Sequence, residues 1–278
     1  MTTITNPYNS TREDDRLVAE REEKQYSLGQ ILGIWLAAGA PMWLLGWVAY
    51  PALSAGLSPF DAGLLRINLM AVGRVWQFVL AMLVLYREEG NLRLSTIRRR
   101  FWLNHPVSPR TGETNKRLWM WILPLILLVA FLEIGLRSAL VDVWTAIFPS
   151  FAEPGGYDLS GMFSPELQAQ WIGAWGLLGL FIMQALFNTF LGEEFIFRGV
   201  LLPKMQGVFG KWDWAANAVI FGLYHLHQPW GILNDIAVGL VFAFTGKRFR
   251  SSWFPIILHS GQSIYFTLLI LGLVLGLA

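Results

Sequence analysis

The amino-acid sequence predicts an all-α, polytopic membrane protein, and three observations carry this prediction. The 278 residues are 54% hydrophobic and only 14% charged, whereas a soluble domain carries about 25% charged residues. The mean hydropathy is +0.46. Fourteen tryptophans and nineteen phenylalanines supply the aromatic side chains that membrane proteins place at their water interfaces.

The chain is predicted to begin with a polar segment outside the membrane. Residues 1–26 are polar and mixed in charge without an early apolar stretch, so we expect a polar cytoplasmic tail and no signal peptide. Residues 27–278 are predicted to form one membrane domain. The chain contains no cysteine, which excludes disulfides, thiolate metal sites and a cysteine nucleophile.

A spanning helix needs about 20 mostly apolar residues, and seven segments meet this requirement approximately. A further helix or re-entrant piece could lie within residues 139–167, so the sequence predicts about seven transmembrane helices, with room for an eighth. The seven predicted spans are residues 28–50, 68–86, 118–136, 170–197, 213–229, 231–246 and 253–275.

Lysine and arginine predict the orientation of these spans. Basic residues gather in the N-terminal tail, the 87–117 loop and the two short connections near 204–211 and 247–250. Two predicted spans separate each of these segments from the next, so all four fall on the same side of the membrane. The odd number of spans then places the C-terminus on the opposite side. Because cytoplasmic loops carry the excess of lysine and arginine, we expect the N-terminus inside and the C-terminus outside.

The segment GEEFIFRG, residues 192–199, ends the fourth predicted span. Glu194 and Arg198 are spaced i, i+4, so they share a helix face and can pair. Glu193 points about 100° away and lacks this local partner. One interpretation is an interfacial charge cluster that ends the span. The other is a division of labour, in which Arg198 fixes Glu194 while Glu193 faces a cavity as a base or ligand.

Two later spans each contribute a histidine in apolar surroundings. His225 follows Phe221 by one helical turn, and His259 precedes Ser263 by one turn. Each histidine alone fits a packing role as well as a site role. The separations from Glu193 to His225 and from His225 to His259 each correspond to about one helix and a connection. Consecutive packed helices could therefore bring these three side chains together.

Two histidines and a carboxylate suit two kinds of hydrolytic chemistry. They can hold Zn²⁺ with an open position, which lowers the pKa of a bound water to about 7. Alternatively, the glutamate can deprotonate a water directly while the histidines orient it and stabilise an oxyanion. The sequence contains no HExxH helix, so the arrangement of soluble zinc proteases is absent.

Other charges in the apolar segments suggest structural roles. Glu133 and Arg137 are spaced i, i+4 and are predicted to form a structural pair. Arg74 is predicted to reach the outer interface by extending along its span. Asp235 has no partner that the sequence indicates and stays an open candidate.

These motifs resemble those of the CPBP family of intramembrane endopeptidases, which includes CAAX prenyl proteases and bacteriocin-processing or immunity proteins. The family patterns are EExxxR, FxxxH and HxxxN or HxxxD on successive helices. This sequence matches them with Glu193-Glu194-xxx-Arg198, Phe221-xxx-His225 and His259. The resemblance covers about residues 170–270 and divides the membrane domain into N-terminal spans with a basic loop (27–169) and catalytic helices (170–278).

The resemblance implies a role for each matched residue. Glu193 and His225 would activate water, His259 and the residue four positions later would stabilise the oxyanion or help bind metal, and Glu194 with Arg198 would support the site. Ser263 stands where the family has Asn or Asp. The family is often described as metalloproteases, although a metal-free glutamate mechanism has been argued for it, so Zn²⁺ bound by Glu193, His225 and His259 stays open.

The implied function is hydrolysis of a peptide bond in a membrane-associated peptide or protein, with or without a prenyl group. The partners would be this substrate and the lipid bilayer, with no nucleic acid. The implied location is the bacterial inner membrane, with the active site facing the cytoplasm. Ser263 favours the alternative of a weakly active or inactive immunity or regulatory protein of the same fold. A proton-coupled transporter is a third alternative, because buried Glu and His residues also form proton relays; the inverted repeats of many transporters are not seen.

Overall fold

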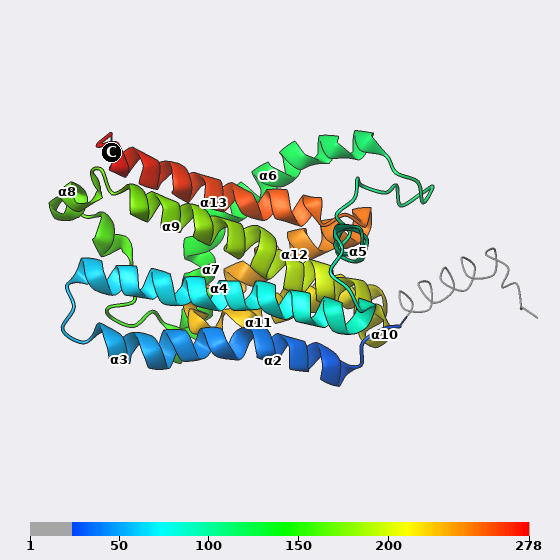
Figure 1. Cartoon of the computed structure of the whole chain (residues 1–278), viewed down its shortest axis with the longest axis horizontal. Coiled ribbons are helices and arrows are strands. Elements are labelled where there is room, and N and C mark those ends of the chain that lie inside the picture. The colour runs from blue at the N-terminus through cyan, green and yellow to red at the C-terminus, as the bar shows by residue number, and fades with distance from the viewer. Residues whose placement is uncertain (1–23, 278) are drawn as a thin grey trace, which may run out of the picture.

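The computed structural model describes residues 24–277, and within this range the chain folds almost entirely into helices (Figure 1). One isolated β-bridge, between Val107 and Thr114, is the exception. Most of residues 1–26, the predicted polar tail, lies outside the described range. The all-α, polytopic prediction is confirmed.

Six helices in the described part of the chain are long and apolar enough to cross a membrane. Several of them combine α-helical, 3₁₀ and π-helical stretches without a break. They are Leu28–Ser54, containing α2 (Leu28–Leu44) and α3 (Tyr50–Ser54); α4, Pro59–Glu89; Lys116–Ile147, containing α6 (Ile122–Ala130) and α7 (Arg137–Ile147); Trp175–Lys204, which begins with α9 (Trp175–Ala185); Pro229–Phe249, which includes α12 (Ile232–Phe249); and α13, Trp253–Val274.

The fifth predicted span, residues 213–229, is shorter than expected. It forms α11 (Asp213–Tyr224), which has 12 residues and is about 18 Å long, against a hydrocarbon core of about 30 Å. Two 3₁₀ turns follow, η11 (His225–His227) and η12 (Pro229–Gly231), and lead directly into α12. The chain therefore turns at the depth of His225, and α11 and α12 pack together as a hairpin.

The region proposed for an eighth helix, residues 139–167, contains the end of α7 and three short 3₁₀ turns, η4 (Pro149–Phe151), η5 (Ser160–Phe163) and η6 (Pro165–Leu167). It forms a folded loop at one end of the bundle. Among the described residues, none of its pieces is long enough to span.

The basic segments meet at the other end of the bundle (Figure 1). Backbone hydrogen bonds join them: the amide of Tyr26 donates to Lys204 (2.9 Å), and that of Val107 donates to Phe249 (2.8 Å). This end also carries α5 (Leu94–Arg100) and α10 (Gln206–Phe209). The arrangement agrees with the pattern of cytoplasmic loops. The cytoplasmic position of the N-terminus stays a prediction.

The GEEFIFRG segment lies where the fourth long helix widens. Two π-helical stretches, η7 (Leu186–Gly192) and η8 (Phe195–Leu201), flank Glu193 and Glu194, and η9 (Leu202–Lys204) ends the helix. A side chain at Gly192 would place its Cβ 2.2 Å from the carbonyl oxygen of Phe187 and 3.2 Å from that of Arg74. Glycine therefore permits the π-helical turn and the close approach to α4. π-Helical turns occur often at functional sites.

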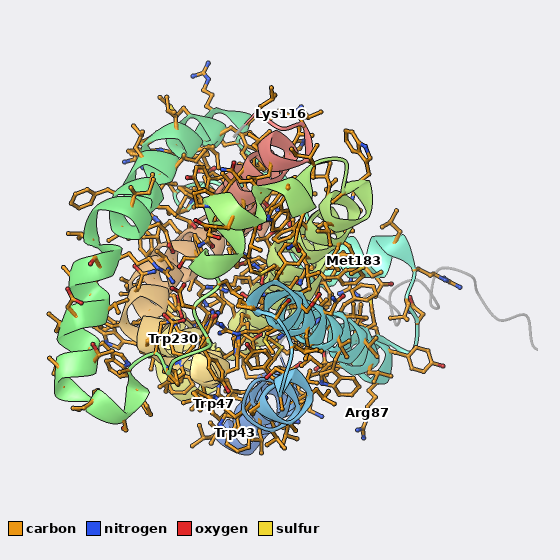
Figure 2. All side chains as sticks on the ribbon, turned by 90° about the vertical axis from the view of Figure 1, so that its left-hand side faces the viewer. Trp43, Trp47, Arg87, Lys116, Met183 and Trp230 are labelled. Carbon is orange, nitrogen blue, oxygen red and sulfur yellow. The ribbon has the colours of Figure 1, made fainter. Side chains whose placement is uncertain are left out.

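The main core surrounds this widened helix. Phe195, Ile196 and Phe197 are almost completely buried and pack against α4 and α11. On the outside of the bundle, many large apolar side chains are exposed, as expected for contact with lipid. Viewed along the bundle, Trp43 lies on the outside, while Trp47 and Trp230 lie farther in (Figure 2).

Candidate active site

The structure brings together the three ionisable side chains that the sequence placed on separate spans. Glu193 is 2% exposed, and its Oε2 atom lies between two imidazoles. His225 Nε2 is 4.0 Å from this oxygen, and His259 Nε2 is 3.9 Å from it. One carboxylate oxygen thus faces two imidazole nitrogens across gaps that are wider than a direct hydrogen bond.

Three elements position these side chains at the same depth. Glu193 lies between η7 and η8, and His225 begins η11 where α11 ends. His259 lies in the first half of α13, toward the end of the bundle where the basic segments meet (the basic end). α11 stops at Tyr224, and His225, the next residue, lies beside Glu193. The aromatic ring of Phe221 packs edge-on against both His225 and His259, with centroid separations of 5.0 and 6.1 Å.

Glu194 and Arg198 form the pair expected from their spacing, and both side chains are fully buried. Glu194 Oε1 lies 3.3 Å from Arg198 Nη1. The guanidinium carbon of Arg198 also lies 4.1 Å from the centroid of the Phe221 ring, within the range of a cation–π contact. A contact that the sequence did not indicate completes the group: Glu194 Oε1 is 3.0 Å from Nδ1 of His259. Glu194 therefore orients His259.

His225 has a second acidic neighbour, which answers the question left open for Asp235. Nδ1 of His225 lies 3.0 Å from the carbonyl oxygen of Phe221 and 3.6 Å from Oδ2 of Asp235. A proton on Nδ1 would be donated to the Phe221 carbonyl, with the Asp235 carboxylate close by, and would leave Nε2 without a proton, facing Glu193. The signal in the sequence was an acidic residue early in an apolar helix that follows His225 closely.

A cavity of about 810 Å³ extends from these side chains along the bundle. Glu193, His225 and His259 lie near its basic end, whereas Glu153, Tyr157 and Phe163 of the opposite loop lie at its other end. Ser263 and Gln262 line the same cavity, and so does Asn188, an amide on η7 that the sequence analysis did not single out. The site is thus a wall of a chamber that is large enough for a peptide segment.

The donor atoms can be compared with a zinc site. Zn²⁺ binds nitrogen and oxygen at about 2.0–2.2 Å in a tetrahedron, so neighbouring donors lie about 3.3 Å apart. The two distances measured from Glu193 Oε2 are 3.9 and 4.0 Å. Within residues 24–277, no group of three or more His, Asp or Glu side chains is placed to hold a metal ion. As arranged, the side chains do not form a zinc-ligand set, and no catalytic step is assigned to zinc.

Charged residues around the rest of the cavity have identifiable partners. The predicted pair forms between Glu133 Oε2 and Arg137 Nη1 (3.1 Å). The prediction that Arg74 extends to the outer interface is wrong, because its Nη1 donates to Oε1 of Gln184 at 2.5 Å between α4 and α9. An amide acceptor inside the bundle thus binds one nitrogen of this guanidinium, while its Nε is buried without a hydrogen-bond partner among the described residues.

The loop at the far end is fastened by Arg66. Its guanidinium donates to the carbonyl oxygen of Tyr157 and lies 5.0 Å from the ring of Tyr157 and 5.5 Å from that of Trp230. Burial raises the pKa of Glu153 in this loop, while the positive charge of Arg66 opposes the rise. The end of the cavity opposite Glu193 is therefore a charged, partly buried rim.

The comparison with known families agrees with this geometry. Residues 170–265 match the family model described as Rce1-like, type II CAAX prenyl endopeptidase Rce1-like. This segment is about a third of the chain and contains Glu193, Glu194, Arg198, His225, His259 and Ser263. No curated protein and no solved structure matches the chain. The match supports a CAAX-type intramembrane protease, and the resemblance to the CPBP family found in the sequence is confirmed.

Proposed function

We propose that the protein is an intramembrane endopeptidase that hydrolyses a peptide bond of a membrane-associated, prenylated peptide or protein. The observation that carries this proposal is the buried carboxylate of Glu193, with one oxygen facing His225 and His259 across about one water molecule. The adjoining cavity supplies room for a substrate, and the family match supports the peptidase class.

In the proposed reaction, a water molecule lies between Glu193 and His225. Glu193 removes a proton from this water as its oxygen attacks the carbonyl carbon of the scissile bond. His225 orients the water through Nε2, because the carbonyl oxygen of Phe221 accepts the proton on its Nδ1 and the nearby carboxylate of Asp235 favours a proton there. The carbon–nitrogen bond then breaks, and the proton held by Glu193 passes to the leaving amine. The products are a carboxylate and an amine.

The negative oxygen of the tetrahedral intermediate needs a donor, and His259 is proposed to provide it. The Oε1 atom of Glu194, 3.0 Å from Nδ1 of His259, stabilises the protonated imidazole. Nε2 of the protonated ring then donates to the oxyanion. Ser263, which lines the same cavity one turn along α13, is proposed to give a second, weaker hydrogen bond.

A cleavage assay tests this proposal. Purified protein would be incubated with a farnesylated peptide and with the same peptide lacking the lipid, and products would be identified by mass spectrometry. We expect cleavage of the lipidated peptide, loss of cleavage in Glu193→Ala and His225→Ala, and normal cleavage in Glu113→Ala, an exposed glutamate of the basic loop. A glutamate mechanism also predicts that turnover survives exhaustive chelation. Undiminished turnover in Glu193→Ala would sink the assignment.

The proposed orientation places the N-terminus and the basic segments in the cytoplasm of a bacterium, with the protein in its inner membrane. The sequence suggested a cytoplasm-facing site, but the cavity lining favours substrate entry from the opposite half of the bundle. The chain lacks cysteine, so Ser160→Cys and Thr111→Cys can be labelled individually. We expect an impermeant maleimide to label Ser160→Cys in intact cells and Thr111→Cys only after lysis. The reverse pattern would contradict this orientation.

The alternative is a regulatory or immunity protein that keeps the fold without turnover, and Ser263 is the feature that favours it. A serine hydroxyl offers a weaker oxyanion donor than the amide of an asparagine. This alternative predicts no cleavage of either peptide and an unchanged cellular phenotype in Glu193→Ala and His225→Ala.

A further inference from the structure

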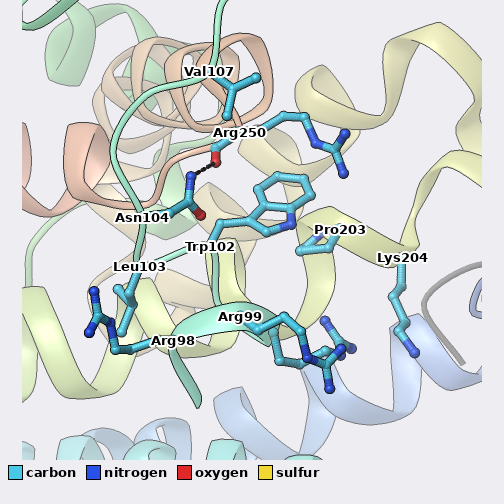
Figure 3. Close-up of a pocket in the computed structure, with 10 residues that line it drawn as sticks. Arg98, Arg99, Trp102, Leu103, Asn104, Val107, Pro203, Lys204 and Arg250 are labelled. Carbon is cyan, nitrogen blue, oxygen red and sulfur yellow. Dashed lines mark hydrogen bonds between the residues drawn. The ribbon is translucent and has the colours of Figure 1, made fainter. Parts of the chain in front are cut away.

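A second cavity, of about 500 Å³, lies at the basic end of the bundle and shares no lining residue with the Glu193 cavity. It is formed by the last residues of α5 and the chain that follows, by the end of the fourth long helix and by the residue after α12 (Figure 3). Half of its lining side chains are basic and none is acidic. The lining residues are Arg98, Arg99, Arg100, Trp102, Leu103, Asn104, Val107, Pro203, Lys204 and Arg250.

Among residues 24–277, the charges around this cavity leave an excess of positive charge, which rests on Arg98 and Arg250. Two carboxylates outside the lining bind part of the positive charge of the lining: Glu88 pairs with Arg100 (2.7 Å), and Glu89 pairs with Arg99 (2.8 Å). Arg98 and Arg250 take no part in these pairs. The guanidinium of Arg250 lies 5.8 Å from the ring of Trp102, which holds it across one wall of the cavity.

The backbone of this wall adopts a conformation that non-glycine residues rarely adopt. Trp102 (φ 52°) and Arg250 (φ 45°) are the two non-glycine residues with positive φ in the described part of the chain, and both line this cavity. Hydrogen bonds hold each of them: Ser252 N donates to the carbonyl oxygen of Trp102 (2.9 Å), and Asn104 Nδ2 donates to that of Arg250 (3.0 Å). Such conformations persist where the surrounding structure over-determines them and cluster at ligand sites.

We propose that this cavity binds a phosphate-bearing anion, with the phosphodiester headgroup of an anionic lipid as the ligand that the membrane supplies. Arginine side chains suit phosphate because their planar donors match its oxygens. The volume is in the range of small-molecule sites. Basic pockets between transmembrane helices at the cytoplasmic surface meet anionic headgroups directly. This inference is independent of the peptidase activity.

The ligand would contact the helix that carries the site. Arg100 Nη1 lies 3.4 Å from the carbonyl oxygen of Gly199 in η8, and Pro203 and Lys204 line the cavity at the end of that helix. A bound headgroup therefore lies against the same element as Glu193, at its basic end.

The test measures binding to delipidated, full-length protein by native mass spectrometry. The probes are phosphatidylglycerol, phosphatidylcholine and inorganic phosphate. The test variant is Arg98→Gln with Arg250→Asn, because asparagine tolerates the positive φ at position 250. The control is Arg110→Gln with Arg248→Gln, two exposed basic residues outside the cavity. Thermal midpoints of both variants must match the unmodified protein.

We expect phosphatidylglycerol to bind in preference to phosphatidylcholine, and the test variant to bind it at least 10-fold more weakly than the control. Binding of phosphate alone, lost in the test variant, would keep the anion site and assign it to a soluble ligand. Equal retention of phosphatidylglycerol by the test variant and the control would overturn the proposal. Binding of neither phosphatidylglycerol nor inorganic phosphate would overturn it as well. If the test variant is unstable, Trp102→Phe, which preserves the charges, must bind normally.

Discussion

The ion pair between Glu194 and Arg198 offers a prediction whose magnitude follows from the structure. Both side chains are fully buried, and their atoms lie 3.3 Å apart. With an effective dielectric constant of about 20, a pair at this distance attracts by about 5 kcal/mol before the cost of desolvation is subtracted. The face of Phe221, 4.1 Å from the guanidinium carbon, adds about 2 kcal/mol in a desolvated setting.

Replacing one member alone leaves the other charge buried without its partner. We therefore expect Arg198→Met to lower the free energy of unfolding by about 3–5 kcal/mol. The double variant Glu194→Gln with Arg198→Met removes both charges and should lose less than Arg198→Met alone. The measurement is reversible unfolding in mixed detergent micelles, with Arg248→Met, an exposed residue near the basic end, as the control.

Two results would refute this reasoning. If Arg198→Met stayed within about 0.5 kcal/mol of the unmodified protein, as surface substitutions do, the pair would not be energetically significant. The single variant Glu194→Gln completes the comparison. If its loss of stability and that of Arg198→Met simply added in the double variant, Glu194 and Arg198 would not be coupled.

Three further predictions concern the surroundings of the site. Gly192→Ala should destabilise the protein and reduce cleavage, because its Cβ would lie 2.2 Å from a backbone carbonyl, while Gly261→Ala, which meets nothing within 4 Å, should leave thermal unfolding unchanged. Asp235→Asn should reduce kcat and shift the pH profile of cleavage with little change in KM, because it alters the hold on His225 Nδ1; an unchanged profile would restrict Asp235 to packing. Burial raises the pKa of Glu153 in the folded protein. The stability that this carboxyl group contributes is therefore present below its unfolded pKa of about 4.3 and is lost as pH rises through its folded pKa. Glu153→Gln should flatten the dependence of the thermal midpoint on pH in that window, and an unaltered slope would contradict this assignment.

Much of the fold could be predicted from the sequence because lipid exposure imposes long apolar segments. Six of the seven predicted spans correspond to long helices. The exception is α11, which ends at Tyr224, whereas the predicted span ran on through residues 225–229, where the structure has 3₁₀ turns. Hydropathy measures the polarity of a segment and does not report where its hydrogen-bonding pattern changes.

The sequence indicated which side chains would lie together at the candidate site, but only part of their geometry. Counting residues along regular helices would place Glu193 and His225 at different depths. In the structure the two side chains lie level, with π-helical stretches on both sides of Glu193 and α11 ending directly before His225. These departures depend on tertiary packing, such as the contact of Gly192 with α4.

The contacts of Asp235 with His225 and of Glu194 with His259 were not predicted, for a related reason. Each joins residues on different helices. Local spacing indicates partners within one helix, as it did for Glu194 and Arg198, but it does not indicate which faces of two helices meet.

The central claim is that Glu193 is the base of a hydrolytic site completed by His225 and His259. The most direct measurement is the rate of cleavage of a farnesylated peptide by Glu193→Gln, which preserves the shape of the side chain and removes its basicity. General-base catalysis contributes about 10²–10⁴ in rate, so we predict a loss of at least about 100-fold with an unchanged thermal midpoint. Turnover within about twofold of the unmodified protein would contradict the account.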